Sequence, residues 1–261
     1  MMRVSTSRIV PYDCSKYTPQ KNEDFRFFLR THIKITDYTL RRNIWADPSY
    51  HYFDITAGPG KGEYGPGSPV IFCEEIKSIN RQYQATFIEY DEKKCQELRL
   101  NLTPYADNRG HLTIHCGDHH SVLGEYIRTK HAKDYGLLFD DPTGQIPSFD
   151  LLAKFAEYYP RIDILIYVAP TNIKRQYQSR LCSNDLRLED FIKQIPKAYW
   201  LIRKPQGRHQ WTFLLGTNWD SFPCFKSRGF YHKDSEQGQE IFNRINYTKD
   251  ELNGTNRTLF D

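Results

Sequence analysis

Residues Tyr52 to Gly67 read Y-F-D-I-T-A-G-P-G-K-G-E-Y-G-P-G, and this stretch decides the fold. It begins with aromatic and aliphatic residues around Asp54, as in a strand that is buried on both faces. Glycine then recurs, which allows sharp turns and the close approach of a ligand to the backbone. Ser68-Pro69 supplies a cap and a first-turn proline, so a helix is expected to follow. Strand, glycine turn and helix form the layout of a nucleotide-binding βα unit.

The glycine turn differs from two common nucleotide-binding loops. No Gly-Lys-Ser/Thr closes it, as in the phosphate loop of nucleotide hydrolases, and Pro59 interrupts the spacing of a dinucleotide site. The pattern Asp54-x-x-Ala57-Gly58-Pro59-Gly60, with Gly62 beyond it, resembles instead the S-adenosylmethionine loop of class I methyltransferases. A plain glycine-rich surface loop is the alternative interpretation.

Downstream, β-prone runs alternate with helical patterns. Strands are expected at 85–89, 112–116, 135–140 and 162–168, and helices at about 69–81, 91–102, 149–158 and 188–194. The two last strands, 199–203 and 211–216, are joined by a short linker and should pair antiparallel. This order predicts an α/β protein with the Rossmann-like fold of class I methyltransferases: a mostly parallel, seven-stranded sheet that ends in an antiparallel hairpin.

The flanking segments carry no comparable motif. Residues 1 to about 20 are polar, and one or two amphipathic helices are expected between Glu23 and Arg42. A polar segment with one more helix, near residues 237–245, follows Pro223. We therefore expect an N-terminal arm with helices at 1–48, a cofactor-binding domain at 49–220 and a helical extension at 221–261.

The composition limits the class of protein. The chain of 261 residues has 15% aromatic residues, enough to build a core from large rings, and its net charge of +4 permits a polyanionic partner without demanding one. The six cysteines are scattered without a Cys-x-x-Cys pair, so reduced thiols in a cytoplasmic protein are expected. The sequence shows no apolar signal core and no stretch of membrane-spanning length, so no membrane contact is expected.

Acidic residues follow the predicted second and third strands. Glu89 lies where a Rossmann-type site holds ribose hydroxyls, although an acid that favours a helix start is the alternative. Asp118 lies where methyltransferases contact the adenine amine of the cofactor. Tyr90, His119 and Asp140, which adjoin these positions or end the fourth strand, complete the expected cofactor site. The run of His115, Cys116, His119 and His120 straddles a strand end without a second ligand cluster, so no metal is expected.

The fourth predicted strand runs into Asp140-Asp141-Pro142-Thr143-Gly144, over the ligand crevice of such a fold. Asp141-Pro142 is similar to the Asp/Asn-Pro-Pro-Tyr/Phe motif of adenine amino-methyltransferases. There an acid or amide oxygen and a backbone carbonyl hold the exocyclic amine while an aromatic ring stacks on the base. Asp141, Pro142 and Thr143 are therefore the candidate catalytic residues. The stacking ring must come from elsewhere, with Tyr64, Phe149, Tyr167 and Trp211 as candidates; a plain turn is equally compatible with the motif.

Cations and an aromatic residue mix in the linker of the predicted hairpin. Arg203, Lys204, Arg208 and Trp211 are the candidate nucleic-acid-binding residues there, and Lys226, Arg228, Tyr231, His232 and Lys233 could extend that surface. A solvated hairpin turn explains the same residues without any partner.

Together these motifs resemble the three-Cys-motif partner protein family, a branch of the class I methyltransferases. The resemblance covers most of residues 22 to 220 and is carried by Phe53 to Gly60 with Gly67-Ser68-Pro69, by Phe87 to Asp91, by Phe139 to Gly144 and by Leu214 to Asn218. It implies binding of S-adenosylmethionine, with Asp54, Ala57, Gly58 and Gly60 around the methionine part, Glu89 on the ribose and Asp118 on the adenine. Thr143 stands where the family has an aromatic residue.

Two functional hypotheses remain open. The first is a methyltransferase that acts on an exocyclic amine, adenine for preference, of DNA or RNA. The second is a non-catalytic partner module that keeps the fold, or an enzyme that acts on a protein or small molecule. A nicotinamide-dependent oxidoreductase is disfavoured by Pro59 and by the terminal hairpin. The sequence does not decide the oligomeric state.

Overall fold

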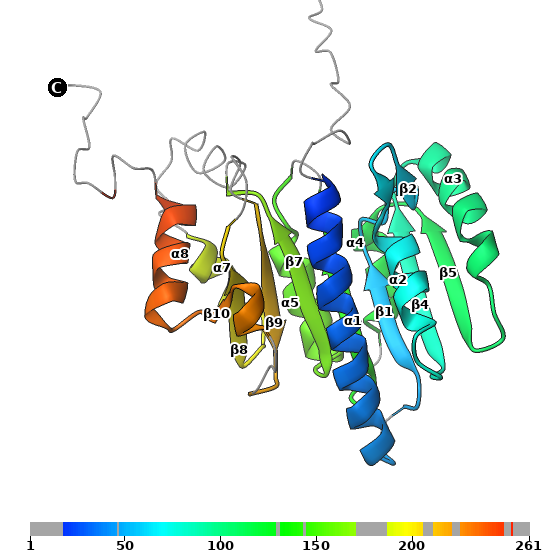
Figure 1. The fold of residues 1–261 in the computed structure, drawn as a ribbon, viewed down its shortest axis with the longest axis horizontal. Coiled ribbons are helices and arrows are strands. Elements are labelled where there is room, and N and C mark those ends of the chain that lie inside the picture. The colour runs from blue at the N-terminus through cyan, green and yellow to red at the C-terminus, as the bar shows by residue number, and fades with distance from the viewer. Residues whose placement is uncertain are drawn as a thin grey trace, which may run out of the picture.

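A single eight-stranded sheet forms the centre of the protein (Figure 1). The computed structural model describes residues 18–45, 47–128, 131–142, 145–170, 187–205, 211–220, 225–247 and 252. The strands of the sheet are β1 (Tyr50–Asp54), β4 (Tyr83–Glu89), β5 (Gly110–Cys116), β6 (Tyr135–Asp140), β7 (Ile162–Val168), β8 (Tyr199–Arg203), β9 (Thr212–Thr217) and β10 (Phe230–His232). A separate two-stranded ribbon joins β2 (Lys61–Gly62) to β3 (Gly65–Pro66).

The strand order is β10-β8-β9-β7-β6-β1-β4-β5. Strands β5, β4, β1, β6 and β7 are parallel, whereas β9 runs antiparallel to both β7 and β8. This confirms the class I methyltransferase fold and the terminal hairpin. The sheet has one strand more than the seven expected, because β10, from the C-terminal segment, pairs with the free edge of β8. The chain order reverses between β1 and β6, so the switch point that binds ligands in such folds lies at their carboxyl ends.

Helices cover both faces of the sheet, because side chains alternate between the faces along each strand (Figure 1). Tyr52 faces α2 and stacks on Phe72 with ring centroids 4.2 Å apart. The adjacent Phe53 points to the other face, 5.1 Å from the ring of Phe155 in α5. One face carries α1 (Thr18–Arg42), α2 (Ser68–Ile76) and α3 (Glu92–Leu102); the other carries α4 (His119–Tyr126), α5 (Phe149–Tyr158), α7 (Leu188–Ile192) and α8 (Glu236–Asn246).

The N-terminal segment forms one long helix, α1, that crosses the middle of the sheet (Figure 1). Phe25 stacks on Phe139 of β6 with centroids 4.3 Å apart. Further along, the buried His32 lies 3.0 Å from a carboxylate oxygen of Asp163 and 2.8 Å from the hydroxyl of Tyr50. These polar contacts satisfy groups that burial would otherwise leave unpaired. No helix among the described residues is long and apolar enough to cross a membrane.

The close packing of β1 against β6 gives a test of the fold. A Cβ atom at Gly136 would lie 1.7 Å from the carbonyl oxygen of His51, whereas a Cβ at Gly124 in α4 would meet nothing within 4 Å. We expect Gly136→Ala to lower the free energy of unfolding by about 3 kcal/mol or more, through overpacking. Gly124→Ala should leave it unchanged or raise it by roughly 0.5–1 kcal/mol. Urea unfolding of both variants measures the difference, and equal stability would contradict the register.

Candidate active site

Three carboxylates converge at the switch point of the sheet. Asp54 ends β1, Asp140 ends the neighbouring β6, and Asp141 follows directly. Asp54 and Asp140 are almost completely buried. Asp54 accepts hydrogen bonds from the hydroxyl of Tyr52, at 3.3 Å, and from the backbone N–H of Thr56, at 3.4 Å. Oδ2 of Asp140 has no hydrogen-bond partner among the described residues.

Burial and mutual repulsion perturb two of these acids. Burial, with the charge of Asp141 as a further cause, raises the pKa of Asp54 from 3.8 to about 7, although hydrogen bonds, that of Ser68 foremost, act in the opposite direction. Burial and the charges of Asp141 and Asp54 raise the pKa of Asp140 from 3.8 to about 8. Paired acids with raised pKa values are typical of functional sites, and a cationic ligand would relieve the repulsion.

Asp141 is held from both sides. Its backbone N–H donates to the hydroxyl of Thr56 at 2.7 Å, and its Oδ2 lies 2.6 Å from the ammonium of Lys21 in the first turn of α1. That ammonium also lies 4.8 Å from the ring centroid of Tyr167, at the end of β7. A cation, a carboxylate and an aromatic face therefore meet beside the buried acid pair.

The glycine turn is shaped by its neighbours. Gly58 and Gly60 have φ angles of 64° and 78°, in the left-handed region that favours glycine. A Cβ at Gly60 would approach Leu98 to 3.0 Å, whereas Gly58 has open space around it. Gly62 lies in the β2–β3 ribbon. This ribbon adds residues between the glycine turn and α2, so Glu89 follows the turn at a longer spacing in the sequence than in an ordinary Rossmann-type site. The side chain of Asn101 donates to the carbonyl of Pro59 at 2.8 Å and fixes the turn against α3.

Glu89 clasps the glycine turn. Its two carboxylate oxygens accept from the backbone N–H groups of Gly58 and Asp91, both at 2.8 Å. Asp91, and not Glu89, caps α3 by accepting from the N–H of Lys94. Tyr90 is exposed between them. Glu89 therefore lies at the strand end beside the turn, with lone pairs left over on each oxygen for a ligand.

Asp118 occupies the end of the next strand and serves as the N-cap of α4. Its Oδ2 accepts from the backbone N–H of Ser121 at 3.1 Å. Burial alone would raise the pKa of Asp118, but the Ser121 hydrogen bonds and the neighbouring histidines hold it below its ordinary value. His119 and His120 each place Nε2 3.1 Å from the hydroxyl of Ser148. Burial, with the adjacent His120, lowers the pKa of His119, so the ring is neutral near pH 7.

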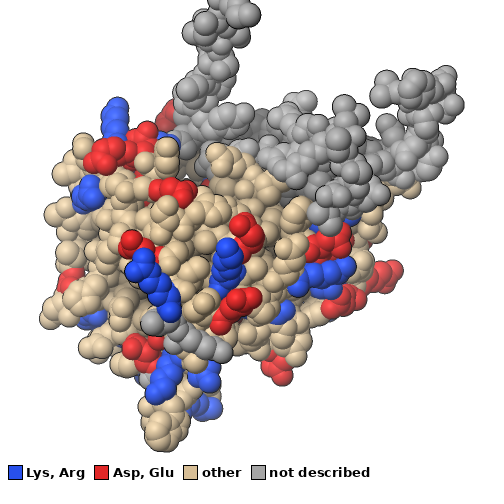
Figure 2. All heavy atoms as spheres, turned by 180° about the vertical axis from the view of Figure 1, so that it is seen from behind, with Lys and Arg blue, Asp and Glu red and all other residues tan. Residues whose placement is uncertain are grey.

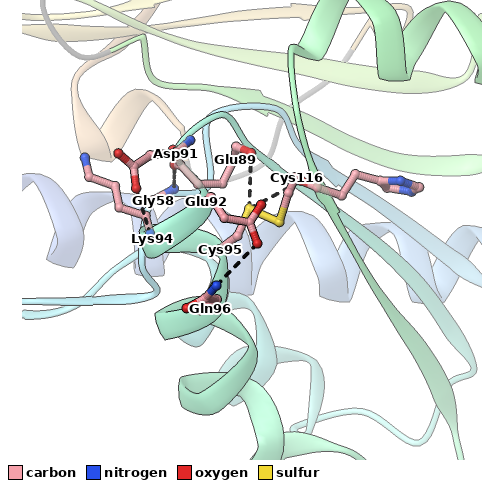
Figure 3. Close-up of a disulfide and its surroundings, with 9 residues drawn as sticks. Gly58, Glu89, Asp91, Glu92, Lys94, Cys95, Gln96 and Cys116 are labelled. Carbon is pink, nitrogen blue, oxygen red and sulfur yellow. Dashed lines mark hydrogen bonds between the residues drawn. A yellow bond between two sulfur atoms is a disulfide. The ribbon is translucent and has the colours of Figure 1, made fainter.

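A disulfide joins Cys95 to Cys116 beside Glu89 (Figure 3). The β4–β5 register places Cys116 opposite Glu89, and Cys95 in α3 lies with its Cα 5.9 Å from that of Cys116. The expectation of reduced thiols is therefore wrong for this pair, since register and not sequence spacing brings the two together. Cys73 is free and buried; Cys14, Cys182 and Cys224 lie outside the described residues. A cytoplasmic location loses the support it drew from the thiols and stays a prediction.

Two of the candidate nucleic-acid residues are buried. Arg203 is buried, 2.8 Å from Asp24 Oδ2 of α1, and its guanidinium lies over the ring of Trp211, which is also buried. Neither side chain is exposed to a nucleic acid in this structure, because Arg203 pairs with Asp24 of α1 and Trp211 packs against Arg203 and Tyr167. Lys204 is exposed. Arg208, like Thr143 of the candidate catalytic motif, lies outside the described residues.

The site fits a cationic cofactor with a nucleoside part. An unpartnered buried oxygen on Asp140, open space around Gly58 and acids at two successive strand ends match the positive charges, the methionine part and the nucleoside of S-adenosylmethionine. The sulfonium and ammonium groups of that molecule would balance the charge of the acid pair.

Three residues that contribute to the site, Ser68, Thr56 and Lys21, are not assigned their roles from the sequence. Ser68 is expected to cap α2, yet the cap is Gly67 and the Ser68 side chain bonds Asp54. Thr56 lies inside the recognised motif, but nothing in its type marks the bond to Asp141. Lys21 precedes the region with helical periodicity and has no signal at all, since a lysine in a first turn is ordinarily solvated.

The chain is similar to solved structures at low sequence identity. No family model matches the chain, and no curated protein sequence matches it, so the resemblance to the three-Cys-motif partner family stays an expectation. The fibrillarin pre-rRNA processing protein of Methanococcus jannaschii is 13% identical over 69% of this chain and 70% of its own, with a TM-score of 0.42. An rRNA methylase from Streptococcus thermophilus is 9% identical over 70% and 94%, with a TM-score of 0.36. WbdD is 10% identical over 78% of this chain, with a TM-score of 0.48, and the chain spans 41% of its length.

The position of Glu89 beside the glycine turn gives a test of the cofactor site. Losing a charged acceptor costs on the order of 1.5–3 kcal/mol, so Glu89→Gln should weaken binding of S-adenosylmethionine about tenfold or more. The matched control is Glu92→Gln, at the first residue of α3. Among the described residues, its carboxylate accepts a hydrogen bond from Gln96 of the same helix and none from the glycine turn. Calorimetry measures both, with circular dichroism as the check on folding. Equal affinities in the two variants would leave Glu89 a structural role only.

The raised pKa values give opposite pH trends for stability and binding. Because Asp54 and Asp140 titrate near 7 and 8 when folded and near 3.8 when unfolded, the stability that their protonation contributes is complete below about pH 3.8. It is lost as the pH rises through the folded pKa values. Binding of a cation should instead strengthen between pH 6 and 9, by roughly tenfold per pH unit while one carboxyl ionises. Asp140→Asn should flatten both profiles and Asp150→Asn, at an exposed position of α5, should flatten neither.

Proposed function

We propose that this protein is an S-adenosylmethionine-dependent methyltransferase that acts on an amine, the exocyclic amine of adenine in a nucleic acid being the preferred acceptor. The observation that carries the proposal is the convergence of Asp54, Asp140 and Asp141 beside the glycine turn, at the switch point of a class I methyltransferase fold. A buried set of carboxylates is costly for stability, which favours a ligand of opposite charge at this place.

The cofactor supplies a methyl group activated by its sulfonium charge. In this proposal Asp54 and Asp140 face its positive charges, and Gly58 and Gly60 let the backbone approach its methionine part. Glu89 accepts hydrogen bonds from the ribose hydroxyls, and Asp118 accepts a hydrogen bond from the adenine amine. The disulfide and the Asn101 bond hold the segments that bear these groups, so the cofactor meets a pre-organised site.

Asp141 and the carbonyl of Pro142 accept hydrogen bonds from the N–H groups of the acceptor amine. The lone pair of such an amine is delocalised into the base, and two acceptors favour the geometry in which it meets the methyl group. Thr56 fixes the backbone of Asp141 for this task. Among the rings that could stack on the base, Tyr167 adjoins this arrangement, since Lys21 contacts both its ring and Asp141.

A nucleic acid would approach along the edge where the parallel strands end. The exposed Lys204 follows β8 at this edge, and its backbone N–H donates to Gly229, next to the exposed Lys226 and Arg228. On the face opposite α1, basic and acidic side chains are interspersed (Figure 2). The cations around Lys204 are therefore the described residues that best fit a phosphate backbone near the site.

One observation favours a second candidate, the non-catalytic partner module. The ammonium of Lys21 lies 2.6 Å from Oδ2 of Asp141 and competes with an acceptor amine for that carboxylate. If Lys21 stays on Asp141 and keeps the amine out, the protein would keep the fold and the cofactor without turnover.

Transfer of a labelled methyl group to pools of DNA, RNA and protein tests the proposal. Label should enter a nucleic acid, and Asp141→Ala should keep cofactor affinity while lowering turnover on the order of a hundredfold or more, because positioning acts on turnover. Asp150→Ala is the control. Wild-type turnover in Asp141→Ala would remove the acceptor role, and label in the protein pool alone would replace the substrate class.

Lys21→Met separates the two candidates in the same assay. An enzyme should retain or gain turnover when Asp141 is freed. Cofactor binding with no labelling in any pool, by wild type or by Lys21→Met, would favour the partner module.

A further inference from the structure

A second cluster of polar side chains lies at the opposite edge of the sheet, where β1 and β6 begin. Asp47, His51 and Asp134 each offer one ligand atom, and these atoms lie within 4.8 Å of one another. Nε2 of His51 is 3.4 Å from Oδ1 of Asp47, and its Nδ1 is 4.0 Å from Oδ2 of Asp134. Nδ1 of His131 lies 3.0 Å from that same oxygen of Asp134.

The cluster is held in place by bonds that do not depend on an ion. The backbone N–H of Asp47 donates to Lys133, which ties together the two loops that carry the carboxylates. The N–H of Ser49 donates to Asp47 Oδ1 at 2.7 Å. His131 stacks flat on Tyr159, with centroids 4.4 Å apart, and His51 is fixed in the central strand β1. The four side chains are therefore pre-organised.

The carboxylates of the cluster favour a bound cation. The cluster holds two carboxylates in a partly buried setting, since His51 and Asp134 are 9% and 13% exposed, whereas Asp47 and His131 are each 35% exposed. Two carboxylates balance a divalent ion, and ligand atoms bound at about 2.0–2.2 Å lie roughly 3–4 Å apart, so small side-chain shifts bring this cluster to an ion.

We infer that Asp47, His51 and Asp134 bind a divalent transition-metal ion, and that His131 holds the carboxylate of Asp134 in place through its 3.0 Å contact. Imidazole nitrogens mixed with carboxylate oxygens suit zinc, iron, cobalt or nickel, whereas magnesium and calcium take oxygen ligands. The sequence predicts no metal, and it does not reveal this cluster, because Asp47 and His51 lie eighty or more residues before His131 and Asp134. The ion lies away from the candidate active site and acts by joining the loops that precede β1 and β6.

Zinc chloride titrated into the full chain after chelator treatment tests this inference. One zinc ion should bind per chain, and zinc should raise the unfolding temperature, as a ligand specific to the folded state does. Asp134→Asn and His131→Ala change loop residues and so spare the central strand, and each should weaken binding about tenfold or more. His111→Ala, at an exposed position of β5, is the matched control and should bind as wild type does.

Absence of zinc binding in wild type, or equal affinity in wild type, Asp134→Asn and His131→Ala, would overturn the inference. Cobalt gives an independent readout, because its visible absorption reports the ligand set, and the band should change in Asp134→Asn but not in His111→Ala. The result is independent of methyl transfer, since neither measurement uses the cofactor.

Discussion

Two carboxylates buried at the ends of adjacent parallel strands impose the condition that the rest of the site meets. Asp54 and Asp140 cannot both ionise freely without water or a cation, and their pKa values rise toward neutrality as a result. Apolar residues at these two positions would make a more stable core. The surrounding bonds from Tyr52, Thr56 and Ser68 support Asp54 and leave Asp140 open to a ligand.

The helix α1 completes this site as well as the core. Its aromatic residues cover the middle of the sheet, and its first turns carry Lys21 and Asp24 to the carboxyl edge of the strands. Lys21 there compensates the third acid, Asp141, and Asp24 compensates Arg203. The same helix fixes its other half through the buried contact of His32 with Asp163. The helix α1 therefore both covers the core and balances the charges at the carboxyl ends of the strands.

The acids at the next two strand ends have double roles. Glu89 clasps the glycine turn and Asp118 caps α4, and both bonds hold a carboxylate that the proposed cofactor would also use. The disulfide between Cys95 and Cys116 connects the segments that carry them (Figure 3). Structural and ligand-binding roles of an acid therefore need not exclude one another, because each oxygen has more than one lone pair.

Local patterns in the sequence determine much of this protein. The apolar runs, the glycine turn and the short hairpin linker predict the βα order and the antiparallel end, and most strand bounds agree closely, because periodicity and turn chemistry act over a few residues. The acids Asp54, Glu89, Asp118 and Asp140 are also found from the sequence, since their places at strand ends follow from the same patterns.

Contacts between distant segments are decided only by the tertiary structure. The added strand β10, the Cys95–Cys116 disulfide, the bond of Lys21 to Asp141 and the burial of Arg203 and Trp211 all join residues far apart in the chain or depend on strand register. A side chain in a linker or a first turn has the same residue type whether it meets solvent, a carboxylate or a core. Only the packing of α1 and the sheet edge distinguishes these cases, and packing is a property of the whole fold.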